Sequence, residues 1–104
     1  MDRTWATIGG LVTWLDTEAA ATGDTARLLR ILKMYEETGE VCGALEDVTA
    51  PAHGPGRHTW EDAQNRLGDT IFRAMIVLTL LTPDAEKLFT SRLARIAERS
   101  GIPA

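Results

Sequence analysis

The central acidic segment of this chain is Lys33-Met34-Tyr35-Glu36-Glu37-Thr38-Gly39-Glu40-Val41, which places three carboxylates within about one and a half helical turns. Like charges at this spacing repel each other and destabilise a helix. A sequence that keeps them requires positive charge nearby, and a divalent cation with oxygen ligands is the obvious candidate. The alternative is an acidic helix face that is simply solvated.

The position of these carboxylates around a helix favours a bound cation. At about 100° per residue, Lys33, Glu37, Glu40 and Ala44 fall in one narrow sector. We expect Glu37 and Glu40 to lie at the rim of the buried face, where partial desolvation makes an unpaired carboxylate costly. The apolar arc of this helix is predicted to continue through Leu28, Ile31, Tyr35, Cys42 and Leu45.

Outward from this segment, the chain is predicted to be all-α, with four helices at about residues 2–18, 24–49, 59–82 and 84–100. Pro51 forbids continuation of the second helix, and the proline- and glycine-rich residues 50–58 form a loop. Thr59 is a predicted N-cap, but Asp62 stands where a capping box normally has Glu or Gln, so we expect an incomplete box. The 104 residues are expected to form one domain with a single core.

The third predicted helix carries two different faces. Its apolar face holds Trp60, Leu67, Ile71, Ala74 and Leu78, and its charged side holds Asp62, Arg66, Asp69 and Arg73. The second half of the helix is apolar nearly all round, which is typical of a helix covered on both sides. A monomer of four helices rarely buries one of its helices on both sides. We therefore predict a homodimer with this helix at or near the interface. A helix buried centrally in one monomer is the alternative.

Composition excludes several classes of function. The net charge of −4 and the lack of a basic cluster argue against nucleic acid as a partner. The single cysteine, Cys42, rules out a disulfide framework within one chain, and its apolar neighbours predict a small buried residue. The longest apolar run, residues 74–81, is too short to cross a bilayer, so we expect no membrane association and a cytoplasmic location.

These residues resemble the MazG-like all-α nucleoside triphosphate pyrophosphohydrolases. That family has the pattern EExxE, a variable spacer and then ExxD, and the resemblance covers most of this chain. The first half is complete within LLRILKMYEETGEVCGAL, residues 28–45. In the second half, Asp69 is kept, but Arg66 stands where the family has Glu.

The resemblance implies a four-helix bundle-like fold that forms a homodimer or homotetramer and converts an NTP or dNTP to the monophosphate and pyrophosphate. Magnesium would be the cofactor, polarising phosphoryl oxygens and activating water. The implied roles are Glu36 and Glu37 in catalysis; Glu37, Glu40 and Asp69 on the metal; and Lys33, Arg66, Lys87, Arg92 and Trp14 on the substrate. Trp5 is a second candidate to contact the base, although both tryptophans also suit a helical core.

Arg66 leaves three possibilities open. The site can bind one magnesium ion through Glu37, Glu40 and Asp69, with Arg66 on substrate phosphate. Asp62 or Glu61 can supply the missing oxygen. Alternatively, the Arg66 guanidinium neutralises the carboxylates, and the protein is a catalytically degenerate nucleotide-binding or interaction subunit. A further hypothesis does not involve this family: the protein is a plain helical dimerisation module, and its acidic cluster is incidental.

Overall fold

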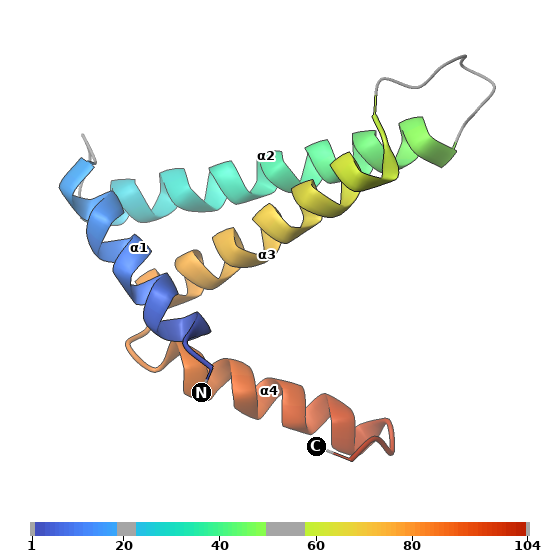
Figure 1. The fold of residues 1–104 in the computed structure, drawn as a ribbon. Helices are drawn as coiled ribbons and strands as arrows, with labels where there is room; N and C mark the ends of the chain where they lie inside the picture. Colours follow the sequence, from blue (N-terminus) through green and yellow to red (C-terminus); the bar gives the residue numbers. More distant parts are fainter. Residues whose placement is uncertain (1, 19–22, 50–57, 104) are drawn as a thin grey trace.

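The computed structural model describes residues 2–18, 23–49 and 58–103, and these form four α-helices (Figure 1). The helices are α1 (Thr4–Glu18), α2 (Gly23–Thr49), α3 (Trp60–Leu81) and α4 (Ala85–Arg99). No strand occurs among the described residues. The all-α, four-helix prediction is therefore confirmed, with each helix end within two residues of its expected position. Of the predicted loop at residues 50–58, all but His58 lies outside the described residues.

The arrangement is an antiparallel pair of long helices with two shorter helices at one end. In Figure 1, α2 and α3 run side by side in opposite directions, and α1 packs against the carboxyl half of α3. Helix α4 leaves the end of α3 and extends away from the α2–α3 pair. The radius of gyration is 16.7 Å, whereas a compact chain of this length has about 13 Å. The single chain is thus an open, angular body.

Local hydrogen bonds explain where α3 begins. The Thr59 hydroxyl accepts from the Asp62 backbone N–H at 3.1 Å, and the Asp62 carboxylate accepts from the Thr59 N–H at 2.9 Å. This is a complete capping box, so the expectation of an incomplete one is wrong: the shorter Asp side chain reaches the N-cap N–H. Just before it, the His58 N–H donates to Asp47 Oδ2 at 2.6 Å, which ties the start of α3 to the end of α2.

The ends of α4 follow their sequence signals. The Thr82 hydroxyl accepts from the Asp84 N–H at 3.1 Å in the turn that separates α3 from α4. At the far end, Gly101 has φ +71°, which suits a residue without Cβ. The Ile102 N–H donates to the Ala97 carbonyl at 2.8 Å and the Gly101 N–H to the Glu98 carbonyl at 3.2 Å. This is the Schellman arrangement, and it stops the helix.

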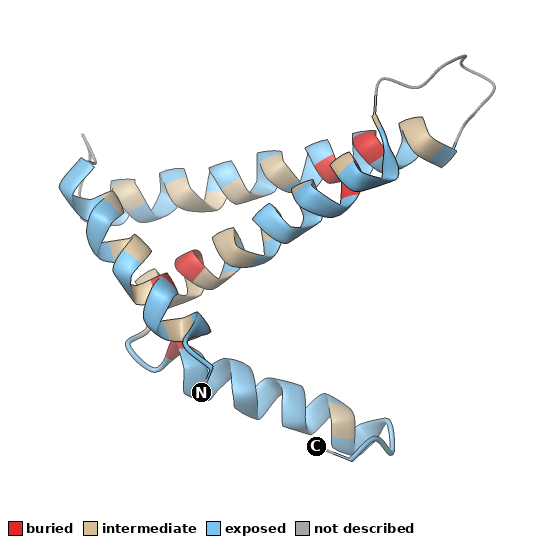
Figure 2. Ribbon diagram, in the orientation of Figure 1, coloured by how far each residue is buried: buried red, intermediate tan, exposed pale blue. Residues whose placement is uncertain are grey.

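The buried core is small. Among the described residues, it consists of Ile8, Val41, Ala44, Ala63, Ile76, Val77 and Ala85 (Figure 2). Ala44 and Ala63 are the least exposed residues of α2 and α3, at 0% and 2%. Side chains this small let the two helix backbones approach closely where these residues pack. No large side chain among the described residues is fully enclosed, so much of the apolar surface of the chain remains in contact with solvent.

The apolar side chains that the single chain exposes on α2 and α3 show that the prediction of a buried Tyr35 and Cys42 is wrong. Trp60, Leu67 and Ile71 are 48–55% exposed, because α3 instead turns its charged side, with Arg66 and Arg73, toward the carboxylates of α2. On α2, Tyr35 is 78% exposed and Cys42 is also exposed, since both lie on the side of the helix away from α3. Each long helix thus has an outer apolar face that no part of the described chain covers.

The membrane expectation has one structural test. Within residues 2–18, 23–49 and 58–103, none of the helices combines the length and the apolar character needed to cross a bilayer.

Candidate functional site

The carboxylates of the central acidic segment lie at the contact between α2 and α3. Arg66 Nη1, from α3, donates to Glu40 Oε2, from α2, at 3.0 Å. The two side chains are 38% and 49% exposed, so the pair lies at the edge of the helix contact. The guanidinium thus reaches across to α2, as helix packing of the kind that the resemblance implies would have it. It forms no hydrogen bond with Asp62 or Asp69 on its own helix.

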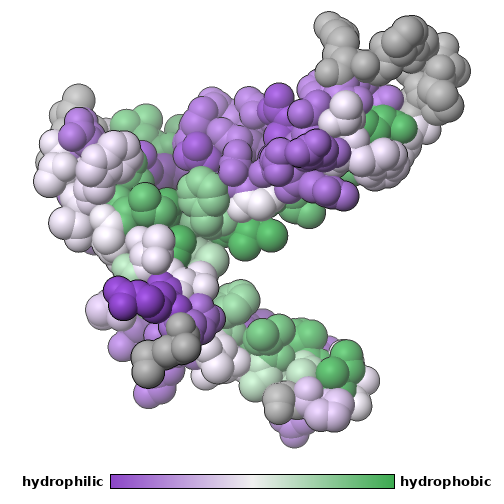
Figure 3. All heavy atoms as spheres, in the orientation of Figure 1, coloured by the Kyte–Doolittle hydropathy of each residue, from purple (hydrophilic) through white to green (hydrophobic). Residues whose placement is uncertain are grey.

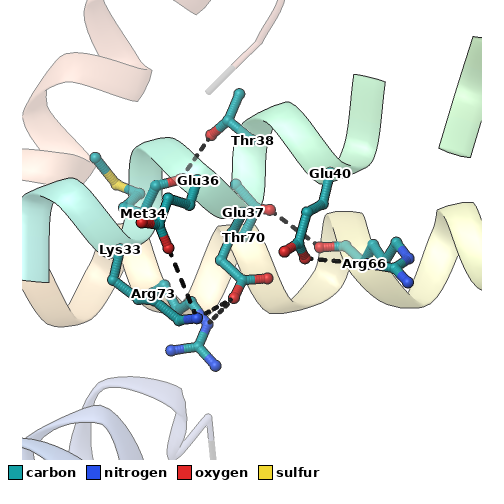
Figure 4. A network of polar contacts seen from close by, with 9 residues as sticks. All are labelled: Lys33, Met34, Glu36, Glu37, Thr38, Glu40, Arg66, Thr70 and Arg73. Carbon is teal, nitrogen blue, oxygen red and sulfur yellow. Dashed lines mark hydrogen bonds and ion pairs between the residues drawn. The ribbon is translucent and has the colours of Figure 1, made fainter. Parts of the chain in front are cut away.

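Glu37 is the most shielded of these carboxylates, with a side chain only 12% exposed. Its Oε1 lies 3.4 Å from Lys33 Nζ and 3.7 Å from Arg73 Nε, so a cation from each helix flanks it (Figure 4). Arg73 Nε is buried and makes no hydrogen bond with any described residue. The Arg73–Glu37 contact is therefore an ion pair and leaves a donor available to another acceptor.

The other predicted metal and catalytic residues are less engaged. Glu36 is 66% exposed and lies 3.9 Å from Lys33. Asp69 is exposed and forms no hydrogen bond or ion pair with the described residues. Glu61 is exposed as well. The Asp62 carboxylate is bound in the N-cap of α3, and the hydrogen bond from the Thr59 backbone lowers its pKa below 3.8.

Magnesium was the predicted cofactor, and Glu37, Glu40 and Asp69 were its predicted ligands. Among the described residues, no three Asp, Glu, His or Cys side chains are grouped closely enough to hold a metal ion. The cations already in place explain this: Glu40 is bound by Arg66, and Glu37 is flanked by Lys33 and Arg73. Adding a divalent cation to this arrangement would place it beside two guanidinium groups, which is electrostatically unfavourable. The residues as arranged do not fit the ion.

A pocket on the Glu37 side of this network has the opposite character. It lies between α1, α2 and α3, encloses about 20 Å³, is partly open to solvent, and is lined by Arg30, Lys33, Arg73, Leu15, Ile76 and Val77. Arg30 makes no ion pair or hydrogen bond with another described residue. Three cationic side chains around a small space have the charge and the donors that suit an anion. The sequence contained a signal for it, because Arg30 and Lys33 are three residues apart on one helix, but Arg30 was not identified.

The remaining predicted substrate residues do not join this site within one chain. Lys87 and Arg92 belong to α4, which extends away from α2 (Figure 1). Trp14 is 57% exposed on α1 and does not line the pocket, although the adjacent Leu15 does. Trp5 packs against Phe89 of α4, with ring centroids 5.8 Å apart, and so connects α1 to α4.

Comparison with protein-family models, with curated proteins and with solved structures finds no match to this chain.

Proposed function

We propose that this chain is a MazG-like helical protein that has become a nucleotide-binding or interaction subunit, and that it holds a phosphate group without magnesium. The observation that carries the proposal is the convergence of Arg30, Lys33 and Arg73 on one pocket. In a protein with a net charge of −4, such a local excess of positive charge favours an anionic ligand at this pocket. The family resemblance supplies the class of ligand, a nucleoside triphosphate.

The charge balance of the pocket supports an anionic ligand. Three cations line it, and among the described residues Glu37 is the only carboxylate that contacts two of them. Glu37 therefore holds Lys33 and Arg73 in place but compensates only part of their charge. Because Arg73 Nε has no hydrogen-bond acceptor among the described residues, a phosphate oxygen would satisfy it.

The size of the pocket excludes an enclosed nucleotide. Pockets that enclose entire drug-sized ligands usually measure about 300–1,000 Å³. This pocket encloses only about 20 Å³, so a phosphate group would lie at its open mouth, with the sugar and base outside. The exposed ring of Trp14 is next in sequence to Leu15 of the pocket wall and is a candidate to contact the base.

The test is calorimetry with pyrophosphate and with ATP, each in the presence of EDTA. We expect Lys33→Gln to weaken binding about tenfold, since it removes one charge-assisted contact. Glu37→Gln is expected to preserve or strengthen binding, because it removes a negative charge beside the phosphate. Arg27→Gln is the matched control, because Arg27 lies on the same helix but pairs with Asp24 and does not line the pocket. Absence of binding, or equal weakening by the control, would refute the proposal.

The second candidate is the magnesium-dependent NTP pyrophosphohydrolase implied by the resemblance. The shielding of Glu37 favours it, because a carboxylate that is 12% exposed at a helix contact suits a catalytic site. It requires Arg66 to leave Glu40. The test is pyrophosphate release from a panel of canonical and modified NTPs and dNTPs at millimolar magnesium. Turnover that Glu37→Gln abolishes would establish this function, and the same variant thus separates the two candidates.

We also propose that the assembly is a homo-oligomer, a homodimer or homotetramer, as the sequence predicts. The outer apolar face of α3, which leaves Trp60, Leu67 and Ile71 exposed in the described chain, supports it.

A further inference from the structure

A second hollow lies beside α1, next to the pocket of Arg30, Lys33 and Arg73, which we call the cationic pocket. It is an open groove of about 550 Å³ between the amino-terminal half of α1 and the middle of α3. Figure 3 shows apolar side chains gathered where these two helices meet. Pockets for small-molecule ligands usually measure about 300–1,000 Å³, so the groove has the size of a binding site.

The surface of the groove is mostly carbon. Ile8, Leu11 and Phe72 line it, and the four polar residues beside them turn mainly their apolar atoms toward it. The Asp2 carboxylate accepts from the Thr4 N–H at 2.8 Å and from the Thr4 hydroxyl at 2.5 Å, so these polar groups of the lining are already paired. A nucleobase in the groove would leave the donors and acceptors of its edge short of partners, which is costly. A hydrocarbon group has none to satisfy.

The groove and the cationic pocket are formed by neighbouring residues on both helices. On α3, Phe72 lines the groove and Arg73 the pocket, and Arg73 Cζ lies 5.5 Å from the centre of the Phe72 ring. On α1, Leu11 lines the groove and Leu15 the pocket, one helical turn or about 6 Å further along. One small ligand can therefore reach both spaces.

We propose that the groove binds the hydrocarbon group of a small phosphate ester, a prenyl or alkyl diphosphate with one hydrocarbon chain, whose phosphates lie at the cationic pocket. The positive charge of the pocket selects the anionic end of such a ligand, and the carbon surface of the groove selects the other end. The groove thus adds a second class of ligand to the nucleotides of the proposed function. The inference rests on the anion site of that proposed function, but the groove is a separate surface with its own test.

The first experiment compares geranyl diphosphate with inorganic pyrophosphate by calorimetry in EDTA, at concentrations too low for micelles. Because each buried CH₂ adds about fourfold to the affinity, we expect geranyl diphosphate to bind at least about tenfold more tightly. Geraniol, which has the same chain without phosphates, should bind far more weakly than geranyl diphosphate.

Each other result of this comparison has a definite meaning. Equal affinities for geranyl diphosphate and pyrophosphate overturn the inference and leave the proposed function in place. Geraniol that binds as tightly as geranyl diphosphate also overturns it, because the cationic pocket would then contribute nothing. Absence of pyrophosphate binding refutes the proposed function and this inference with it.

The second experiment fills the groove. Thr7 is exposed and lines the groove, so Thr7→Trp adds bulk there without removing a core side chain. We expect this variant to lose the preference for geranyl diphosphate and to keep its affinity for pyrophosphate. Thr13→Trp is the matched control, because Thr13 is exposed on the same helix and lines neither space. A preference that survives Thr7→Trp, or that Thr13→Trp removes equally, overturns the inference.

The same two variants identify other occupants of the groove. ATP affinity should be unaffected by Thr7→Trp, and a loss as large as that of geranyl diphosphate would place the base in the groove and overturn the hydrocarbon assignment. Light scattering should give both variants the mass of the unaltered chain. A change of mass confined to Thr7→Trp would show that another copy of the chain covers the groove, which also overturns the inference.

Discussion

Arg66 of α3 and Glu40 of α2 form a hydrogen-bonded ion pair of 3.0 Å between positions that are 26 residues apart in the chain. In the proposed MazG-like alignment, Arg66 stands where that family has an acidic residue, so the pair would join the altered half of the proposed motif to its intact half. Because the guanidinium supplies the positive charge that Glu40 requires, the two helices hold together here without a metal ion.

A double-mutant cycle with Arg66→Ala and Glu40→Ala is expected to give a coupling energy of about 0.5–1 kcal/mol in urea unfolding. Both side chains are partly exposed, so solvent screening keeps the value in this range. The coupling should decrease as salt is raised from 0.05 to 0.5 M. A coupling indistinguishable from zero at low salt would show that the contact contributes nothing to stability.

Arg66→Glu should turn the cation-rich contact into a carboxylate cluster. With Glu40 released and a new carboxylate beside it, we expect magnesium binding that calorimetry detects and that raises the melting temperature. Without magnesium, the variant should be less stable than the unaltered chain because like charges then face each other. Arg66→Gln removes the cation but adds no ligand, so it serves as the control and should gain no magnesium binding.

Ala63→Leu should destabilise the fold by about 1–3 kcal/mol, because Ala63 is 2% exposed at the α2–α3 contact and a larger side chain forces the helices apart. The measurement is the midpoint of urea unfolding. Ala94→Leu on the exposed side of α4 is the matched control and is expected to stay within about 0.5 kcal/mol. Equal effects of the two substitutions would mean that the α2–α3 contact accommodates the larger side chain at position 63 without loss of stability.

Thr59→Ala should cost about 1 kcal/mol, because it removes the hydroxyl that accepts from the Asp62 N–H at the start of α3. Chemical unfolding measures this directly. Thr59→Ser keeps the acceptor and should restore most of the loss. If Thr59→Ala and Thr59→Ser had the same stability, the proposed role of the cap would be contradicted.

The acid side of the stability curve should depend on Asp62. The hydrogen bond from the Thr59 N–H lowers the Asp62 pKa in the folded protein below its ordinary value of 3.8. A carboxyl with a lower pKa in the folded state stabilises the fold at neutral pH, and this stabilisation is lost as the pH falls from 3.8 through the folded pKa. The stability difference between the unaltered chain and Asp62→Asn should therefore shrink below about pH 4. A difference that is constant from pH 7 to 3 would contradict this origin.

Local sequence signals predicted the helices well. Thr59, the Thr82–Asp84 turn and Gly101 each act through their own backbone geometry, so their effects are visible without tertiary contacts. The capping box was misjudged only because Asp is shorter than the usual Glu. The position of Lys33, Glu37 and Glu40 on one side of α2 also followed from helical spacing. Arg30 was missed, because its importance depends on Arg73, 43 positions later in the chain.

The sequence by itself determined four helices and a row of carboxylates that needs positive charge, because hydrophobic spacing, caps and like-charge repulsion are local properties. Only the tertiary structure decided which side of α3 meets α2. Both an apolar stripe and a cationic stripe were available, and the cationic one packs there because α2 presents Glu37 and Glu40. That choice leaves the apolar stripe outside, since one helix surface cannot face two directions at once.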